Sequence, residues 1–309
     1  MEFHILAFST QTKKQPLLFI IFFFIYMTGI IGNLTILLLV SIDNNLHTPM
    51  YFFLGNLSFI DISFTTVSLP KFMDILITGY NSISFIQCLT QTYFSVFFSS
   101  TEVVLLSFMA YDRYLAICNP LSYHVFMNNK KCVMISLALW TTGCVNSFLL
   151  TGFASKLSFC KSTSLRQFYC DIKALTSISC DNTVLHNIIS VESFVFGMFP
   201  LLLSLISYIK IIICILNMKS VNSKRKAFST CTSHLTVLLI FYGTLVCVYM
   251  GSASEQAGEM DQVFSVLYTA VTPMLNPLIY SLRNREVKKA LINILPINYL
   301  LISTKEAFT

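Results

Sequence analysis

Long apolar blocks separated by short polar segments form the dominant pattern along this chain. A helix needs about 20 mostly apolar residues to cross a bilayer, and seven blocks reach that length: 17–41, 50–69, 88–118, 132–155, 187–209, 227–251 and 262–282. Strands of a membrane barrel would instead alternate apolar and polar residues over about 10 positions. The pattern therefore predicts an all-α integral membrane protein, a bundle of seven transmembrane helices.

Lysine and arginine are unequally divided between the two sides of the expected bundle. With seven spans the chain ends lie on opposite sides, and 13 basic residues fall on the C-terminal side against 7 on the N-terminal side. Because Lys and Arg concentrate in cytoplasmic loops, we expect an extracellular N-terminus and a cytoplasmic C-terminus in a multi-pass protein of the plasma membrane. This topology accounts for the net charge of +6, so we expect no nucleic-acid partner.

Composition supports lipid as the solvent of the apolar blocks. Of the 309 residues, 55% are hydrophobic and 11% are charged, whereas soluble domains carry about 25% charged residues. No cleavable signal peptide is expected, because the first block is too long for a signal-peptide core. We expect an extracellular N-terminus at 1–16, a seven-transmembrane domain at 17–282, and an amphipathic helix with a cytoplasmic tail at 283–309.

The segment after the seventh block predicts a short amphipathic eighth helix. Val287, Leu291 and Ile294 form one apolar stripe, and basic residues occupy the other faces. A helix of this kind lies on the anionic inner leaflet, which makes membrane lipid an expected partner. A polar tail without a stable helix is the alternative.

Two acidic residues inside the apolar blocks are candidates for chemistry. Asp61 and Glu102 lie near the middle of the second and third blocks, where a charge is costly. If they face each other, both cannot stay ionised without a cation between them, which predicts a sodium or proton site. Alternatively, each carboxyl is hydrogen-bonded separately. The sequence has no glycine-rich phosphate loop and no histidine pair at metal-ligand spacing, so we expect no enzyme and no other cofactor.

Four of the ten cysteines fall on the expected extracellular side: Cys88, Cys160, Cys170 and Cys180. Disulfides persist on that side of the membrane. Four cysteines allow three pairings, and spacing alone leaves the choice open.

Five motifs, in a fixed order along the chain, carry a resemblance to a known family. They are LHTPMYFFL at 46–54, MAYDRYLAIC at 109–118, SY at 207–208, KAFSTCTSHL at 226–235 and PMLNPLIYSLRN at 273–284. Together, over roughly residues 7–292, they closely resemble the odorant (olfactory) receptors, a family of rhodopsin-like G-protein-coupled receptors. A chance match to one motif is plausible, whereas a match to all five is not.

The resemblance implies a signalling mechanism. Asp112 would hold Arg113 at rest, and Arg113 would meet a G protein once the sixth helix swings outward. Pro277 lacks a backbone N–H and can bend the seventh helix. The usual partner is a stimulatory, olfactory-type G protein, so cyclic AMP would rise. The coupling and activation residues would be Asp112, Arg113, Tyr114, Tyr208, Asn276, Pro277 and Tyr280. Without the family, Asp112 and Arg113 would be interpreted as an ion pair that anchors the helix end.

The resemblance also selects among the disulfide pairings. Cys88 would pair with Cys170 and tie the third helix to the second extracellular loop. Cys160 would pair with Cys180 inside that loop.

A ligand pocket is expected in the extracellular half of the bundle, between the third, fifth, sixth and seventh helices. On each helix, the expected ligand contacts have the spacing that places them on one face. They are Ser95, Val96, Ser99, Ser100, Val103, Glu192, Phe196, Tyr242, Leu245, Tyr249, Val266, Thr269 and Ala270. Such a pocket is mostly apolar with a few hydroxyls, which suits a small, weakly polar odorant. For each residue, plain helix packing is the alternative.

Glu192 leaves the ligand class open. If its carboxylate faces the pocket, it favours a cationic ligand; if it faces the outer loop, it says nothing about ligands. The segment Leu89–Thr101 of the third helix contains no acid, and the seventh helix contains no lysine. The salt bridge of biogenic-amine receptors is therefore not expected on the third helix, and a retinal Schiff base is not expected on the seventh.

Two other classes of protein fit part of the pattern. A transporter or channel would show internal repeats and broken helices around charges at the midplane, and no repeat is evident here. A rhodopsin-like receptor for a metabolite would use the same binding physics, and only the tissue of expression would separate it from an odour sensor.

The glycosylation sequons depart from the family pattern. No asparagine precedes Asn33, and the two sequons, at 33–35 and 56–58, fall inside expected helices. We expect either a start upstream of Met1 or a receptor without this glycan, which would affect its trafficking.

Overall fold

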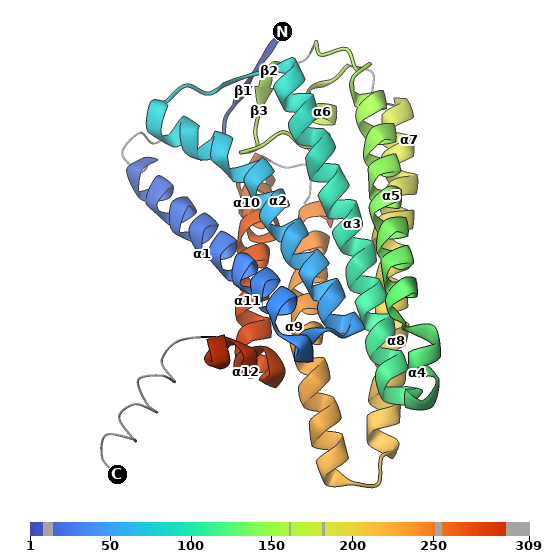
Figure 1. The fold of residues 1–309 in the computed structure, drawn as a ribbon. Helices are drawn as coiled ribbons and strands as arrows, with labels where there is room; N and C mark the ends of the chain where they lie inside the picture. Colours follow the sequence, from blue (N-terminus) through green and yellow to red (C-terminus); the bar gives the residue numbers. More distant parts are fainter. Residues whose placement is uncertain (9–14, 161, 181–182, 251–254, 295–309) are drawn as a thin grey trace, which may run out of the picture.

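The computed structural model describes residues 1–8, 15–160, 162–180, 183–250 and 255–294. These residues form an elongated bundle of long helices (Figure 1). The first four long helices are α1 (Gln15–Ile42), α2 (Pro49–Thr78), α3 (Phe85–Cys118) and α5 (Asn129–Ala154). α3 runs through the centre, in contact with α2, α5, α8 and α9.

The fifth and seventh spans are each built from two helices. The fifth consists of α7 (Thr183–Glu192) and α8 (Phe199–Asn217), and the seventh of α10 (Glu255–Val266) and α11 (Thr272–Arg283). Among the described residues, six segments, including these two pairs, are long and apolar enough to cross a membrane. The remaining long helix, α9 (Val221–Met250), is apolar over Cys231–Cys247. The seven expected spans are thus all helical, as the apolar blocks predict.

A π-helical turn interrupts each of the two paired spans. These turns are Ser193–Met198 between α7 and α8 and Leu267–Val271 between α10 and α11. A π turn adds a residue to the helical repeat, so the side chains on either side of it no longer share the face that regular spacing predicts. The apolar blocks carry no sign of these turns.

Several helices begin or end at residues whose chemistry explains the boundary. Before α3, the Ser84 hydroxyl accepts a hydrogen bond from the Gln87 N–H and the Gln87 side chain accepts one from the Ser84 N–H, which is a capping box. α2 ends at Gly79, whose φ of 71° suits glycine. α2 extends past the apolar block at 50–69: Phe72, Ile75 and Leu76 continue its buried face, and Lys71 and Asp74 pair on the outer face at 2.9 Å.

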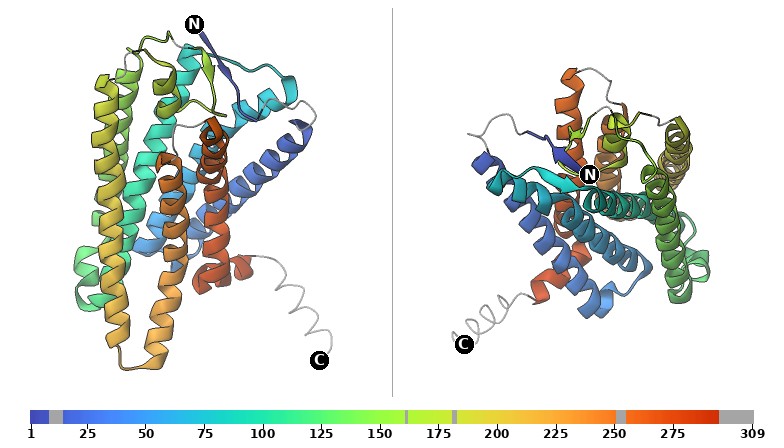
Figure 2. Two further views of the ribbon diagram at one scale, coloured as in Figure 1. Left: turned by 180° about the vertical axis from the view of Figure 1, so that it is seen from behind. Right: turned by 90° about the horizontal axis from the view of Figure 1, so that it is seen from above.

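A three-stranded sheet lies over one end of the bundle, where neither periodicity nor motif predicts strands. β1 (Glu2–Ile5) is central, antiparallel to β2 (Ser82–Ser84) and parallel to β3 (Ser164–Leu165). Figure 2 (right), which looks down on this end, shows β1 above the helices. Within β1, the side chains of Phe3 and Ile5 are fully buried. The first residues of the chain thus pack onto the bundle.

Both disulfides lie at this same end, which we call the disulfide end. Cys88 pairs with Cys170 and Cys160 pairs with Cys180, with Cα–Cα distances of 5.4 Å and 5.7 Å. The first joins α3 to the segment after β3. That segment continues into the short helix α6 (Ile172–Ile178), whose N-terminus is capped by the Asp171 side chain. These are the pairings that the family resemblance implies.

The opposite end, which we call the Arg113 end, carries two short helices. α4 (Pro120–Phe126) follows α3, and α12 (Arg285–Ile294) lies across the base of the bundle (Figure 1). In α12, Val287 and Ala290 are buried, and Leu291 packs against the core. The expected eighth helix is therefore present, and the bundle itself covers much of its apolar face. The Ile294 side chain lies outside the described part.

Polar side chains inside the helices bond to neighbouring helices. Asn33 is buried and donates to the Gly29 and Pro273 carbonyls, both at 3.0 Å. The Asn56 side-chain oxygen accepts hydrogen bonds from Ser136 at 2.9 Å and Trp140 at 3.0 Å. Both asparagines begin glycosylation sequons, and their positions within packed helices agree with the expectation that they carry no glycan.

Candidate functional site

A cavity of about 310 Å³ opens beneath the disulfide end. α3 contributes five predicted residues to its wall, and the fifth and sixth spans contribute four more. These nine are Ser95, Val96, Ser99, Ser100, Val103, Glu192, Phe196, Tyr242 and Leu245. The five α3 residues share one face because this helix is regular throughout, so that residues three to four apart lie on the same side.

On the seventh span, the residue that lines the cavity is not one of those chosen by spacing. Tyr268 lines the cavity, whereas the described wall does not include Val266, Thr269 or Ala270. Thr269 is fully buried and donates to the Ser265 carbonyl at 2.8 Å, and Ala270 packs in the core near the disulfides. Tyr268, Thr269 and Ala270 all lie within the π turn Leu267–Val271, where regular α-helical spacing does not apply. The Tyr249 side chain, also predicted, lies outside the described part of the chain.

The segment after β3 forms a roof over the cavity, and none of its residues is among the predicted ligand contacts. Tyr169, Asp171, Ile172 and Lys173 all line the cavity. The Cys88–Cys170 disulfide and a 2.8 Å hydrogen bond from the Cys170 N–H to the Gln91 side chain hold the roof to α3. Nothing in the periodicity of a loop indicates which of its residues face inward, so the disulfide was the only available signal.

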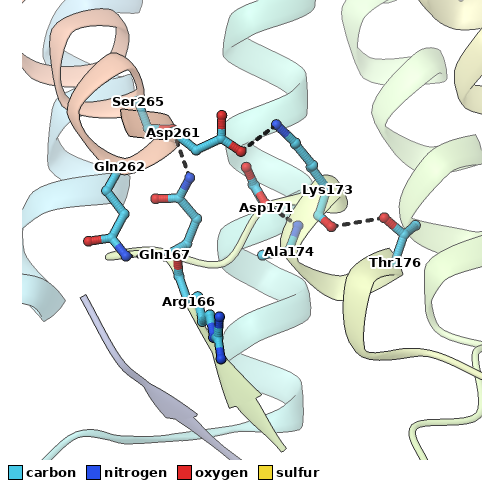
Figure 3. Close-up of polar contacts among 9 residues, drawn as sticks. All are labelled: Arg166, Gln167, Asp171, Lys173, Ala174, Thr176, Asp261, Gln262 and Ser265. Atoms are coloured by element: carbon cyan, nitrogen blue, oxygen red, sulfur yellow. Dashed lines mark hydrogen bonds and ion pairs between the residues drawn. The ribbon is translucent and has the colours of Figure 1, made fainter. Parts of the chain in front are cut away.

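Polar contacts join the roof to α10 on its other side (Figure 3). Lys173 and Asp261 form an ion pair at 2.8 Å, and the Gln167 side chain donates to the Ser265 hydroxyl at 2.8 Å. Gln262 donates to the Arg166 carbonyl at 3.1 Å. The roof is therefore fixed to both the third and the seventh spans.

Asp171 is the buried acid of the roof. Its carboxylate accepts a 2.6 Å hydrogen bond from the Ala174 N–H. Burial raises the pKa of Asp171 from its ordinary value to about 6; the Ala174 N–H and Lys173 lower it, and Asp261 raises it. An acid with this pKa is mostly ionised at pH 7.

Glu192 faces the cavity, which decides between the two orientations left open by the sequence. Asn146 on α5 donates to the Glu192 carboxylate at 3.4 Å and to the Ser100 hydroxyl at 2.8 Å. Both Glu192 and Ser100 line the cavity. A single amide thus orients two polar groups of the wall from behind.

Asp112 and Arg113 form a buried ion pair at the opposite end of α3. Arg113 Nε donates to Asp112 at 3.0 Å, and Arg113 Nη2 also contacts this carboxylate. The Tyr123 hydroxyl on α4 donates to the other Asp112 oxygen at 2.9 Å. Burial, followed by the charge of Asp112, raises the pKa of Tyr123 above its ordinary value. Tyr114, also predicted, packs beside Lys210, whose Nζ lies 5.3 Å from the ring centre.

The remaining predicted signalling residues lie between the cavity and the Arg113 end. Tyr208 hydrogen-bonds to His234 Nδ1 at 2.9 Å, and Tyr280 is fully buried. Asn276 donates to Asp61 at 3.0 Å, and Pro277 packs closely against Gly32. His234 was not among the predicted functional residues, although it lies in one of the five motifs.

Asp61 and Glu102 are both buried within this middle layer. Each side chain is about 1% exposed. Within the described structure, Asp61 Oδ1 and Glu102 Oε1 have no hydrogen-bond partner. Two buried carboxyls with unpaired oxygens therefore lie in this layer, where a charge without a partner would be costly.

Comparisons with known proteins show the family of the chain. The family model described as "Olfactory receptor" matches residues 22–297. The chain is 45% identical to olfactory receptor-like protein OLF4 of dog, covering 94% of each chain. It is 43% identical to human olfactory receptor 7D2, covering 96% of this chain and 95% of the relative.

A solved structure gives the class of fold. Squid rhodopsin matches with a TM-score of 0.76 at 16% identity, covering 93% of this chain and 82% of rhodopsin. The fold is therefore that of the rhodopsin-like, seven-helix G-protein-coupled receptors, which are receptors and not enzymes. Within that class, the chain belongs to the olfactory receptor family.

Proposed function

We propose that the cavity binds a small odorant and that binding activates a stimulatory, olfactory-type G protein, which raises cyclic AMP. The observation that carries the proposal is that α3 spans both sites. Ser95, Ser99 and Val103 line the cavity, and the same rigid helix ends at the buried Asp112–Arg113 pair. A ligand that fits one helix arrangement better than another shifts the population of that arrangement.

The chain would lie in the plasma membrane with the disulfide end outside. The charge distribution and the disulfides support this orientation. The N-terminal segment 1–16 would be extracellular, 17–282 would form the transmembrane domain, and 283–309 would lie at the cytoplasmic face. Arg113 would then face the G protein.

Filling the cavity is expected to abolish the response. Cells expressing the chain with an olfactory-type G protein would be challenged with pooled small odorants while cyclic AMP and surface level are measured. Ser99→Phe places a ring in a cavity of about 310 Å³, so no response should appear at odorant concentrations up to about tenfold above the half-maximal value of the parent, a loss of at least ~1.4 kcal/mol in binding. Ser190→Phe on the exposed face of α7 is the matched control. An unchanged response in Ser99→Phe at equal surface level would contradict the proposed site.

We also propose that Asp61 and Glu102 hold a sodium ion in the resting receptor. Their unpaired buried oxygens and the Asn276 hydrogen bond support this. Asp61→Asn removes one charge, so the effect of external sodium on agonist potency should disappear. Potency in the parent and in Asp61→Asn would be measured with sodium replaced by an organic cation. Equal sodium dependence in both would contradict the proposal.

A further inference from the structure

The cavity wall contains more acidic than basic side chains. Asp171, Lys173 and Glu192 line the cavity. Lys173 also pairs with Asp261 at 2.8 Å, so its positive charge is shared with an acid that does not line the cavity. The wall thus carries two carboxyl groups and one ammonium group that is shared with a third carboxyl group, an arrangement that disfavours an anionic ligand.

Glu192 is the acid within the membrane-spanning part of the wall. Its described polar contact is the neutral amide of Asn146 at 3.4 Å. No lysine, arginine or histidine of the described chain lies within ion-pair distance of Glu192. Asn146 therefore orients the carboxyl without neutralising its charge.

A carboxylate in this setting gains most from a cationic partner. Transfer of an unpaired charge from water to an apolar environment is costly, and attraction between opposite charges is stronger there than in water. The rest of the wall is largely apolar, with Phe196, Leu245 and Tyr268 among the large side chains. Such a wall matches the hydrocarbon body of a ligand, while Glu192 matches a positive end.

We propose that the ligand of this cavity is a small organic amine, whose ammonium group contacts Glu192 and whose hydrocarbon body fills the space beside α3. This inference rests on the proposed function, because it names the ligand class of the same cavity. The acid comes from α7 and not from α3, whose outer segment Leu89–Thr101 contains no acid. Glu192 is thus a specificity-determining residue, and Asn146 is the positioning residue behind it.

Matched probes separate charge from shape. The full-length receptor in lipid nanodiscs would be heated with hexylamine, octylamine, cyclohexylmethylamine or 2-phenylethylamine, and with the corresponding alcohols and carboxylic acids. Cyclic AMP would be measured in cells with the same set. We expect at least one amine to raise the melting temperature and cyclic AMP, at concentrations at least tenfold lower than its alcohol and its acid.

Glu192→Gln tests the contact directly. Glutamine keeps an oxygen that accepts the Asn146 hydrogen bond, so the fold should persist while the charge is lost. The concentration of amine needed for stabilisation should rise at least tenfold, and Glu192→Asp, which keeps the charge, should recover part of the affinity. Asp74→Asn, at an exposed acid of α2 near the same end, is the matched control and should leave amine binding unchanged.

Two readouts distinguish this inference from the proposed function. Stabilisation by an amine that depends on Glu192 but does not raise cyclic AMP would support the ligand class and count against the coupling. Cyclic AMP raised by alcohols or acids alone would support the receptor and overturn the ligand class. The inference is also overturned if no amine of the set stabilises the receptor, or if Glu192→Gln binds amines as well as the parent.

Discussion

Asp112→Asn is expected to raise basal cyclic AMP, whereas Arg113→Ala is expected to abolish the odorant response. Asp112 holds Arg113 through two contacts, and Tyr123 holds Asp112 from the far side at 2.9 Å. Hydrogen bonds to charged groups contribute about 1.5–3 kcal/mol, and ~1.4 kcal/mol is a tenfold change in an equilibrium. Release of Arg113 from this resting pair should therefore increase the basal active population by roughly tenfold.

Loss of the response in Arg113→Ala can come from lost coupling or from lost folding, and the two have to be distinguished. Removal of Arg113 alone leaves Asp112 as a buried charge without its partner, which costs about 3–5 kcal/mol and lowers surface level. The double variant Asp112→Asn with Arg113→Ala removes both charges, so surface level should recover while cyclic AMP stays flat. Recovery of the odorant response in the double variant would show that Arg113 is not the coupling residue.

Gly143→Ala is expected to destabilise the bundle, although alanine normally favours a helix. α3 and α5 approach so closely at Gly143 that an added Cβ would overlap the Thr101 side chain and lie 3.0 Å from the Phe97 carbonyl oxygen. Overpacking of this kind costs about 1–3 kcal/mol. The melting temperature of the purified receptor and its surface level should both fall.

The same helix supplies the control for this variant. Gly152, also on α5, has no atom within 4 Å of an added Cβ, so Gly152→Ala should be neutral or slightly stabilising. Thr101→Ala in the Gly143→Ala background removes the overlapping side chain and should restore part of the lost stability. If Gly143→Ala and Gly152→Ala melt alike, the close approach of α3 and α5 is not as the structure has it.

The sequence predicted the parts of this molecule that follow regular repeats. The seven apolar blocks predict the seven spans because a bilayer demands uninterrupted apolar helices. The five residues of α3 that line the cavity follow from helical spacing, and the family resemblance supplies Asp112 and Arg113. Here periodicity and motif are sufficient because no local irregularity intervenes.

The parts that the sequence missed depend on irregular backbone or on tertiary contacts. Tyr268, which lines the cavity, lies in a π turn that leaves no mark on the apolar pattern. The roof residues Asp171 and Lys173 are placed by a disulfide and by contacts with α10, which no loop periodicity encodes. The sheet strands are two to four residues long, too short for an alternating pattern to stand out.

The central claim, that a ligand in this cavity activates a G protein, is tested most directly with purified components. The receptor in nanodiscs, an olfactory-type stimulatory G protein and an odorant that stabilises the receptor against heat would be mixed, and guanine-nucleotide exchange measured. We predict faster exchange with the odorant for the parent, and no acceleration for Ser99→Phe or for the Asp112→Asn, Arg113→Ala double variant. An odorant that stabilises the parent receptor yet leaves nucleotide exchange unchanged would contradict the account.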